Sequence, residues 1–350
     1  QTDQEGTHVY EHDQAGRLTG VDHPAGAEFG DESYTYDQAN RRTSWHGRPA
    51  SEVVYNDLDQ LVQDADYTYG FDAEGRRIER VNRLTSDVES YAYNVLDQMT
   101  ELVQEDGTVW SYAYDARNLR VLVTSEVGGL ETYGEAFVYD GNGTVRGTFD
   151  TTGSVTASYL AGSGFGQVVA SVDAGGAAED ALRDRLGTTV GWLGAGGGLT
   201  ALQVRDAYGV RALPGGVVPF GYTGHAEDPT GLVWGRARCY APSTGAWTGE
   251  DPVPTEPRYG YVGGRPNYAV DPTGRATATN YGLKVAIAST CTVTVLSFLF
   301  SKMRSGAAAR WGAAADAWEG IDGGFGSNYE HFRVLEAQAE WDAEFLWYLG

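Results

Sequence analysis

The sequence predicts a mainly β protein in which β-hairpins repeat along most of the chain. Three observations support this prediction. The 350 residues include 48 glycines and 22 tyrosines, a composition that favours strands and tight turns over helices. A Tyr/Asp/Gly pattern recurs at steps of about twenty residues through the first 145 residues. From residue 275 onward the composition changes to Ala-rich and apolar stretches.

The repeated pattern reads Tyr-x-Tyr-Asp-x-x-Gly/Asn-Arg in its fullest copies. It is centred on Asp13, Asp37, Asp72, Asp115 and Asp140, with degenerate copies at Asp57 and Asn94. Tyr-x-Tyr alternates with period two, as one face of a strand does. An Asp carboxylate accepts backbone N–H groups in turns, and Gly or Asn three residues later tolerates a positive φ. Each unit is therefore predicted to be a hairpin with a structural Asp. Because a lone hairpin is marginal in water, neighbouring hairpins must pair in one sheet.

This frame resembles the YD repeats of the RHS family, which includes bacterial polymorphic toxins, the C components of Tc toxin complexes and the animal teneurins. The resemblance implies a β-sheet wound in a spiral into a shell, which in the toxins encloses the chain's own C-terminal toxic segment. We assign residues 1–219 to this YD-repeat sheet. Asp184–Thr189 fits the family pattern that precedes the core, and the glycine run 194–198 is interpreted as a hairpin turn.

Residues 220–274 resemble the RHS repeat-associated core domain over nearly its full length. The matching motifs are Phe220-Gly-Tyr222-Thr-Gly224, Thr230-Gly231-Leu232, Arg236-Ala-Arg238-Cys239-Tyr240, Glu250-Asp251-Pro252, Tyr259-Gly-Tyr261-Val262 and Asp271-Pro272-Thr273-Gly274. In the toxins this core closes one end of the shell, as a plug, and acts as a self-cleaving aspartic protease. The resemblance implies that Asp251 and Asp271 are the catalytic carboxylates and that Arg238 orients a carboxylate or the oxyanion. It places the scissile bond between Arg275 and Ala276.

The implied chemistry needs a pair of carboxyl groups, one as base and one as acid, and two nearby carboxyls can share a proton. The chain is therefore at most a self-cleaving aspartic protease. The motif Asp251-Pro-Val-Pro254 lacks the usual Gly, and Arg275 occupies the place of a Leu. The alternative is a structural plug whose Asp-Pro pairs form turns. A third pair, at Asp228, is interpreted as a turn.

Residues 275–350 form a predicted tail that is mostly helical, at the position where the family carries its variable effector. Residues 285–301 are uncharged and lie between Lys284 and Lys302. Seventeen residues are the lower limit for a membrane-spanning helix. Burial within protein and contact with a membrane both remain open. Helices are expected over residues 307–318 and from about residue 327 to 349.

Charge and cysteine content limit the function classes. The net charge of −23 disfavours a nucleic-acid partner, because an acidic surface repels phosphates. Cys239 and Cys291 allow one bridge at most, and no Cys/His spacing typical of a metal site is present, so no cofactor is predicted. The sequence begins at Gln1 without a signal peptide, which suggests a processed piece or a fragment.

The expected function is to encapsulate and help deliver a C-terminal effector or another payload, in a secreted or cell-surface bacterial protein. Its expected partners are its own tail, other RHS segments or identical subunits. The alternative is a non-catalytic structural or adhesive protein of a surface or filament, with the helical tail as an anchor or assembly element.

Overall fold

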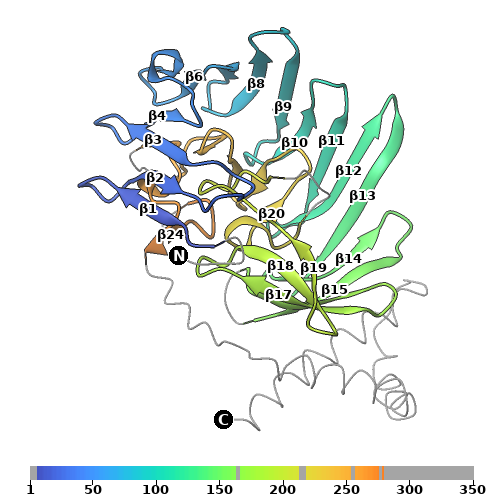
Figure 1. Cartoon of the computed structure of the whole chain (residues 1–350). Coiled ribbons are helices and arrows are strands. Elements are labelled where there is room, and N and C mark those ends of the chain that lie inside the picture. The colour runs from blue at the N-terminus through green and yellow to red at the C-terminus, as the bar shows by residue number, and fades with distance from the viewer. Residues whose placement is uncertain (1–5, 163–165, 213–217, 254–256, 276–277, 280–350) are drawn as a thin grey trace, which may run out of the picture.

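The computed structural model describes residues 6–162, 166–212, 218–253, 257–275 and 278–279. Within these ranges the regular structure consists of antiparallel β-sheets and three short 3-10 helices (Figure 1). The mainly β fold predicted from the repeats is thus confirmed. The predicted tail helices and the apolar segment 285–301 lie outside the described residues.

Two sheets contain the repeats. The first has the order β1-β2-β3-β4 and comprises β1 (Val9–His12), β2 (Leu18–Asp22), β3 (Glu32–Tyr36) and β4 (Arg42–Trp45). The second contains fifteen strands, each paired with its neighbours in sequence. They are β5 (Val54–Tyr55), β6 (Leu61–Gln63), β7 (Tyr67–Phe71), β8 (Arg77–Asn82), β9 (Val88–Tyr93), β10 (Met99–Val103), β11 (Val109–Tyr114), β12 (Arg120–Val127), β13 (Leu130–Tyr139), β14 (Val145–Asp150), β15 (Val155–Ala161), β16 (Val168–Asp173), β17 (Ala178–Arg183), β18 (Thr189–Gly194) and β19 (Leu199–Leu202).

The core segment, residues 218–275, and the strand β25 that follows it form shorter elements. One sheet has the order β20-β21-β22-β23, and β24 pairs with β25. The strands are β20 (Ala226–Glu227), β21 (Val233–Trp234), β22 (Cys239–Ala241), β23 (Ala246–Trp247), β24 (Ala269–Val270) and β25 (Ala278–Thr279). There are three 3-10 helices among the described residues. Along the chain, η1 (Ala50–Glu52) falls between β4 and β5, and η2 (Tyr222–Gly224) and η3 (Val262–Gly264) belong to the core segment. The domain boundary near residue 219 stays a prediction.

Three of the repeat aspartates, Asp13, Asp37 and Asp72, close their turns with the same set of bonds. At Asp72, Oδ1 accepts two backbone N–H groups at 3.1 and 2.8 Å, and Oδ2 accepts from Arg76 Nε at 2.7 Å. Asp13 and Asp37 repeat this arrangement. Gly75 has a φ of +78°, a conformation that side chains with a Cβ rarely adopt. The turn chemistry of the sequence pattern therefore has a direct structural counterpart.

In five of the repeats, the tyrosine before the Asp or Asn links its hairpin to the preceding one. Tyr93 Oη donates to the carbonyl of Arg77 at 2.9 Å, and the Arg76 guanidinium carbon lies 5.1 Å from the Tyr93 ring centroid. Equivalent hydroxyl–carbonyl bonds of 2.7 to 2.8 Å are made by Tyr36, Tyr55, Tyr114 and Tyr139. We call this contact the tyrosine link. The repeat signature therefore joins neighbouring hairpins as well as shaping each turn.

The core segment lies inside the curve of the two large sheets (Figure 1). Its Trp234 and Cys239 pack in one apolar cluster with Leu102 and Val123 of the second sheet. Polar bonds cross the same boundary, such as Tyr259 Oη to the carbonyl of Gly75 at 2.8 Å. Cys239 is buried, and burial raises the pKa of its thiol to about 12. The core segment is thus fixed to the sheets by both apolar and polar contacts.

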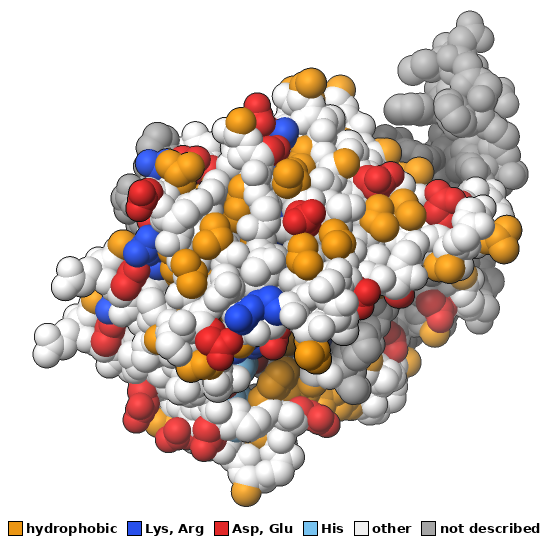
Figure 2. All heavy atoms as spheres, turned by 90° about the horizontal axis from the view of Figure 1, so that it is seen from above, with side chains coloured by type: hydrophobic (Ala, Val, Ile, Leu, Met, Phe, Trp, Pro, Cys, Tyr) orange, Lys and Arg blue, Asp and Glu red, His pale blue; other side chains and the backbone are white. Residues whose placement is uncertain are grey.

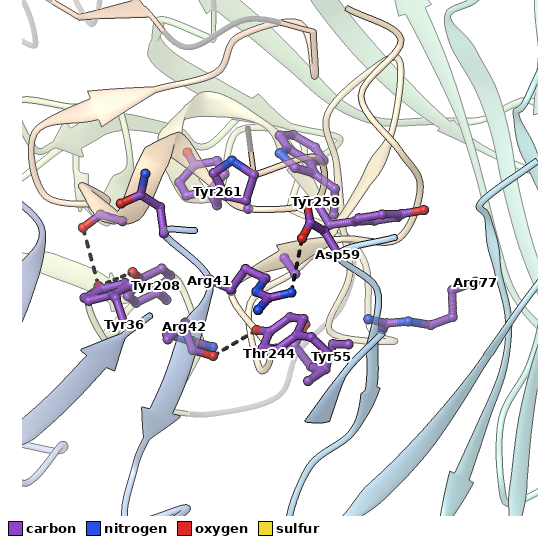
Figure 3. A pocket seen from close by; sticks show the side chains of 18 of the residues that line it. Tyr36, Arg41, Arg42, Tyr55, Asp59, Arg77, Tyr208, Thr244, Tyr259 and Tyr261 are labelled. Atoms are coloured by element: carbon purple, nitrogen blue, oxygen red, sulfur yellow. Dashed lines mark hydrogen bonds and ion pairs between the residues drawn. The ribbon is translucent and has the colours of Figure 1, made fainter. Parts of the chain in front are cut away.

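Arg42 on β4 joins the first sheet to the core segment. Its guanidinium carbon lies 4.4 Å from the Trp45 ring centroid and 4.2 Å from that of Tyr208. A Cβ at Gly245 would come within 2.6 Å of this carbon. Beside it is a cavity of about 30 Å³ (Figure 3). Aromatic faces therefore stabilise this buried cation, whereas the buried Arg120 and Arg238 have carboxylate partners.

The surface is acidic with isolated apolar side chains. Acidic side chains dominate over basic ones on the face shown in Figure 2. The most exposed apolar residues, Leu84, Val95 and Leu130, lie at hairpin ends. Among the described residues, no helix is long and apolar enough to cross a membrane.

Candidate functional site

Three turns of the core segment carry the residues implied by the resemblance. Arg238 lies in the turn between β21 and β22, Asp251 follows β23, and Asp271 follows β24. The three side chains are 5%, 7% and 4% exposed, respectively. Short strands thus bring residues up to 33 positions apart into one buried cluster.

Arg238 contacts both carboxylates through one nitrogen. Its Nη2 donates to Asp251 Oδ2 at 2.7 Å and to Asp271 Oδ2 at 3.3 Å. Its Nε donates to the carbonyl of Gly274 at 2.6 Å, and its guanidinium carbon lies 4.4 Å from the Trp247 ring centroid. Burial lowers the pKa of Arg238, and the two carboxylates oppose that change. The structure therefore brings together all three residues assigned to catalysis.

The Asp271 turn leads directly to the predicted scissile bond. Asp271 Oδ1 accepts the backbone N–H groups of Thr273 and Arg275 at 3.3 and 3.1 Å. A Cβ at Gly274 would come within 2.6 Å of the Gly235 carbonyl oxygen, so this turn packs tightly on the β21–β22 turn. Arg275 is exposed, whereas Ala276 lies outside the described residues. Because β24 pairs with β25, the Arg275–Ala276 bond belongs to the connection between these strands.

This arrangement supplies two carboxylates and a cation beside a peptide bond, which is the inventory of a carboxylate-dependent hydrolase. The two carboxylates are joined through a guanidinium, which differs from a dyad that shares one proton. A proton-sharing geometry would require Arg238 to release one carboxylate. The cluster as it stands also serves to hold three turns together.

His225 was not found by sequence reasoning and lies beside this cluster. Its Nδ1 is 2.9 Å from Thr223 Oγ1. Burial lowers the pKa of His225 to about 4, although the nearby charge of Asp271 acts in the opposite direction. The imidazole is therefore neutral at neutral pH. No motif marks His225 in the sequence; its only signal is a polar residue within a predominantly aromatic and glycine-rich stretch.

Asp228, the third Asp-Pro aspartate, lies in a turn and is engaged in a buried ion pair. Its Oδ1 and Oδ2 each accept from the guanidinium of Arg120 at 2.8 Å, and both side chains are 2% exposed. Burial lowers the pKa of Arg120, but the charge and hydrogen bonds of Asp228, together with the neighbouring Tyr112 and Tyr114, more than offset burial and raise it. This pair connects β12 to the core segment. Sequence reasoning did not identify Arg120 as its partner, because 108 residues separate the two.

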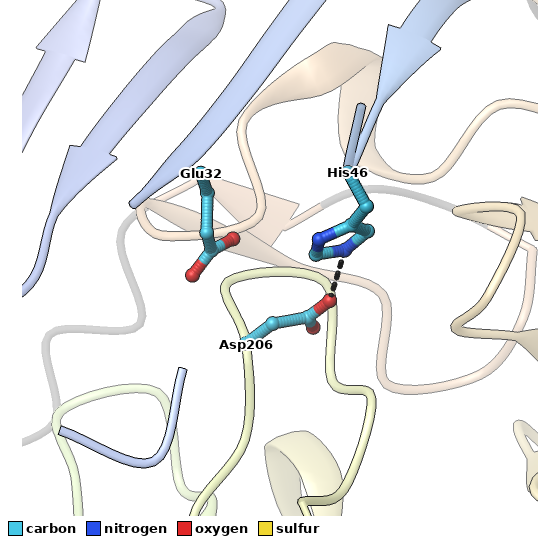
Figure 4. A group of neighbouring side chains, drawn as sticks. All are labelled: Glu32, His46 and Asp206. Atoms are coloured by element: carbon cyan, nitrogen blue, oxygen red, sulfur yellow. Dashed lines mark hydrogen bonds and ion pairs between the residues drawn. The ribbon is translucent and has the colours of Figure 1, made fainter. Parts of the chain in front are cut away.

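A second group of titratable side chains lies outside this cluster. Among the described residues, Glu32, His46 and Asp206 form a group of potential metal ligands (Figure 4).

The teneurin YD-shell family model matches residues 1–256. The chain belongs to the teneurin YD-shell family. This membership confirms the YD-repeat relationship predicted from the Tyr-Asp frame. The match includes both large sheets of the YD shell and extends past Asp251, while Asp271 lies beyond it.

Solved structures similar to this YD-shell chain include Tc toxin components. The crystal structure of TcdB2-TccC3-Cdc42 is 16% identical, with a TM-score of 0.47, over 77% of this chain and 17% of the solved chain. The Photorhabdus luminescens Tc holotoxin pore is 16% identical, with a TM-score of 0.46, over 78% of this chain and 17% of the solved chain. The YD-shell chain thus spans 17% of the length of these solved chains. The comparison with curated proteins gives no significant match.

Proposed function

We propose that this chain forms part of a β-shell that encloses a polypeptide payload, with the core segment as its plug. The observation that carries the proposal is the curvature of the hairpin sheets around residues 218–275, from which the chain continues through β25. Residues 276–350, or another polypeptide, are the payload in this proposal. A secreted or cell-surface bacterial location fits this role.

The plug is proposed to cleave its own chain at Arg275–Ala276. Water attacks the Arg275 carbonyl carbon while one carboxylate of the Asp251/Asp271 pair accepts its proton. The other carboxyl, which is protonated once Arg238 has released it, donates a proton to the departing amine of Ala276, so the peptide bond breaks and water is consumed. In this proposal Arg238 stabilises the negative charge that develops beside the turn, a role supported by the hydrogen bond from its Nε to the Gly274 carbonyl.

Intact-mass measurement tests cleavage. The purified chain should yield fragments that end at Arg275 and begin at Ala276, and Asp271→Asn should prevent their formation. Asp115→Asn is the matched control, because Asn already occupies the equivalent turn position at Asn56 and Asn94, and this change outside the cluster should leave cleavage intact. An uncut wild-type chain after prolonged incubation would contradict self-cleavage and leave the plug as a structural element.

Protease protection tests enclosure separately. Under native conditions the downstream residues should co-elute with the sheets and resist added protease, in both the wild type and Asp271→Asn. After unfolding in urea they should be digested. Equal digestion rates in the native and unfolded samples would contradict enclosure, whatever the outcome for cleavage.

The exposed edge strand β19 favours the structural or adhesive alternative as the second candidate. All four of its residues are exposed, including Leu199 and Leu202. An exposed strand edge is a template for pairing with another chain. Negative-stain imaging distinguishes the two functions, because ordered polymers would support assembly and single curved particles would support enclosure.

A further inference from the structure

Glu32, His46 and Asp206 converge from three separate elements (Figure 4). Glu32 begins β3, His46 lies in the turn after β4, and Asp206 lies in the segment after β19. His46 Nε2 is 2.6 Å from Asp206 Oδ2, and the ligand atoms of all three residues lie within 4.8 Å of one another. Ligand atoms bound tetrahedrally to Zn²⁺ at 2.0–2.2 Å lie roughly 3.4 Å apart. Small side-chain movements would therefore form a metal site.

Asp206 differs from Asp13, Asp37 and Asp72 in that no arginine stands four positions later to bind its second oxygen. Its Oδ1 accepts the backbone N–H of Val210 at 2.7 Å, as in the repeat turns. At Asp72 the second oxygen is neutralised by the arginine four positions later, Arg76. At Asp206 that position is Val210, so Oδ2 is directed at His46 instead. The turn is thus retained, but one oxygen lacks the cation that the repeat normally supplies.

Glu32 is a buried carboxylate on the inward face of its strand. It is 4% exposed, and the alternating burial of β3 places it on the same side as Tyr34. The ion-pair partners of Glu32 and Asp206 in the described residues are imidazoles, those of His23 and His46, rather than Arg or Lys. Two buried carboxylates this close carry a large desolvation cost that a divalent cation would offset.

Two further histidines, His23 and His8, form a hydrogen-bonded chain that begins at Glu32. His23 Nε2 is 2.7 Å from Glu32 Oε1, and His8 Nδ1 is 2.9 Å from His23 Nδ1. Such outer hydrogen bonds orient metal-binding carboxylates. An adjoining cavity of about 270 Å³ is lined by Glu32 and Asp206, which leaves room for a water ligand. His46 adopts a φ of +47°, a conformation in which His is among the enriched residue types.

We propose that Glu32, His46 and Asp206 bind a divalent transition-metal ion of the Zn²⁺ type. One imidazole with two carboxylates suits such an ion, whereas Ca²⁺ and Mg²⁺ prefer oxygen ligands alone. The ion fastens the first sheet to the segment that follows β19, across 160 residues of sequence. It thereby holds the N-terminal hairpins against the interior of the molecule.

Metal titration of the whole chain tests the proposal. The protein is purified without a histidine tag, stripped with EDTA and titrated with Zn²⁺ against a chromophoric chelator. One saturable equivalent is expected, together with a higher melting temperature, and Mg²⁺ should produce neither effect. Co²⁺ should give the visible absorption bands of a site with nitrogen and oxygen ligands. The absence of a saturable Zn²⁺ equivalent would overturn the proposal and leave the cluster as a hydrogen-bonded network.

Substitutions locate the ion. His46→Ala and Asp206→Asn should each weaken Zn²⁺ binding at least tenfold, while His12→Ala, an exposed histidine outside the cluster, should leave it unchanged. Unchanged binding in both cluster variants would refute the assignment. If Asp206→Asn fails to fold, His46→Ala decides alone, because its side chain is 28% exposed in a surface turn.

Discussion

A buried ion pair connects the core segment to the second sheet. Arg120 and Asp228 form a two-bond ion pair with both side chains 2% exposed. The desolvation cost of such a pair is offset only while both partners are present. The pair is therefore a residue-scale test of how strongly the core segment depends on the sheet around it.

Replacing one partner should be far more costly than replacing both. Asp228→Leu leaves the Arg120 guanidinium buried without its carboxylate and should lower the free energy of unfolding by about 3–5 kcal/mol. The double variant Arg120→Met/Asp228→Leu should recover most of that loss. Urea denaturation of the whole chain measures both. The control is Arg117→Met, which breaks an exposed pair with Asp115 and should cost less than about 1 kcal/mol. Equal costs for the single and double variants would contradict this account.

Because His225 is buried in its neutral form, we expect the stability of the folded chain to fall at acidic pH. Its pKa is about 4 in the folded chain against 6.5 as the ordinary value, so the unfolded chain binds the proton more readily. Its contribution is therefore fully present above pH 6.5 and is lost as pH falls from 6.5 to 4. The loss amounts to about 3 kcal/mol.

Urea unfolding at several pH values between 4 and 7 measures this effect. His225→Gln should have a shallower decline than the wild type over that interval, because the variant has no imidazole to protonate. The carboxylates titrate in both proteins, so their contributions largely cancel when the free energies of unfolding of the two proteins are subtracted. Parallel curves for the two proteins would show that another group is responsible.

At the residue scale, the sequence named candidate residues where a local motif existed. The resemblance named Arg238, Asp251 and Asp271, and the structure places them in contact, while their catalytic role stays a prediction. Glu32, His46 and Asp206 were not found, because their partners come from distant turns that share no motif. A sequence pattern gives the face on which a side chain lies but not which remote residue meets it.

At the scale of elements, the repeat sequence determines the hairpins closely. Period-two aromatics and the Asp turn are local features, and the structure contains both. The tyrosine link could not be predicted, because it depends on the stacking of one hairpin on the next. It explains why the second tyrosine of the frame recurs: its hydroxyl satisfies a carbonyl of the preceding hairpin.

Two equivalent turn glycines should respond differently to alanine. Gly16 and Gly75 have φ values of +75° and +78°. A Cβ at Gly16 meets nothing within 4 Å, whereas one at Gly75 would come within 2.6 Å of Tyr259 Oη. Gly16→Ala should cost about 1 kcal/mol for its backbone conformation. Gly75→Ala should cost about 1–3 kcal/mol more, because it also displaces Tyr259. Urea unfolding measures both, and equal costs would show that the core contact contributes little.

At the scale of the whole molecule, two features act in opposite directions on self-association: the net charge disfavours it and the exposed edge strand β19 favours it. The net charge of −23 keeps copies apart, while β19 offers exposed backbone and two exposed leucines. Salt shortens the range of repulsion from about 30 Å at 0.01 M to about 8 Å at 0.15 M. The curved, shell-like sheet was expected from the resemblance to the YD repeats, but the residue pattern of a single hairpin does not give its curvature, because small twists accumulate over fifteen strands.

Self-association should therefore increase with salt. Sedimentation velocity at 0.01 and 0.15 M salt should show a larger associated fraction at the higher concentration. Leu199→Lys combined with Leu202→Lys should abolish this increase without changing the stability of the chain, because both side chains are exposed. The same fraction at both salt concentrations would indicate that β19 does not pair between copies.

The strict sequence order of the strands has a mechanical consequence. Because every strand from β5 to β19 pairs only with its neighbours along the chain, a pull on one end of this sheet loads a single hairpin at a time. The removal of each strand breaks the backbone hydrogen bonds to one neighbouring strand and, in the repeats that have one, a tyrosine link. A pore or motor that draws in such a chain would meet a series of small resistances rather than one high barrier. The resistance would rise at β12, where Arg120 anchors the sheet to the interior.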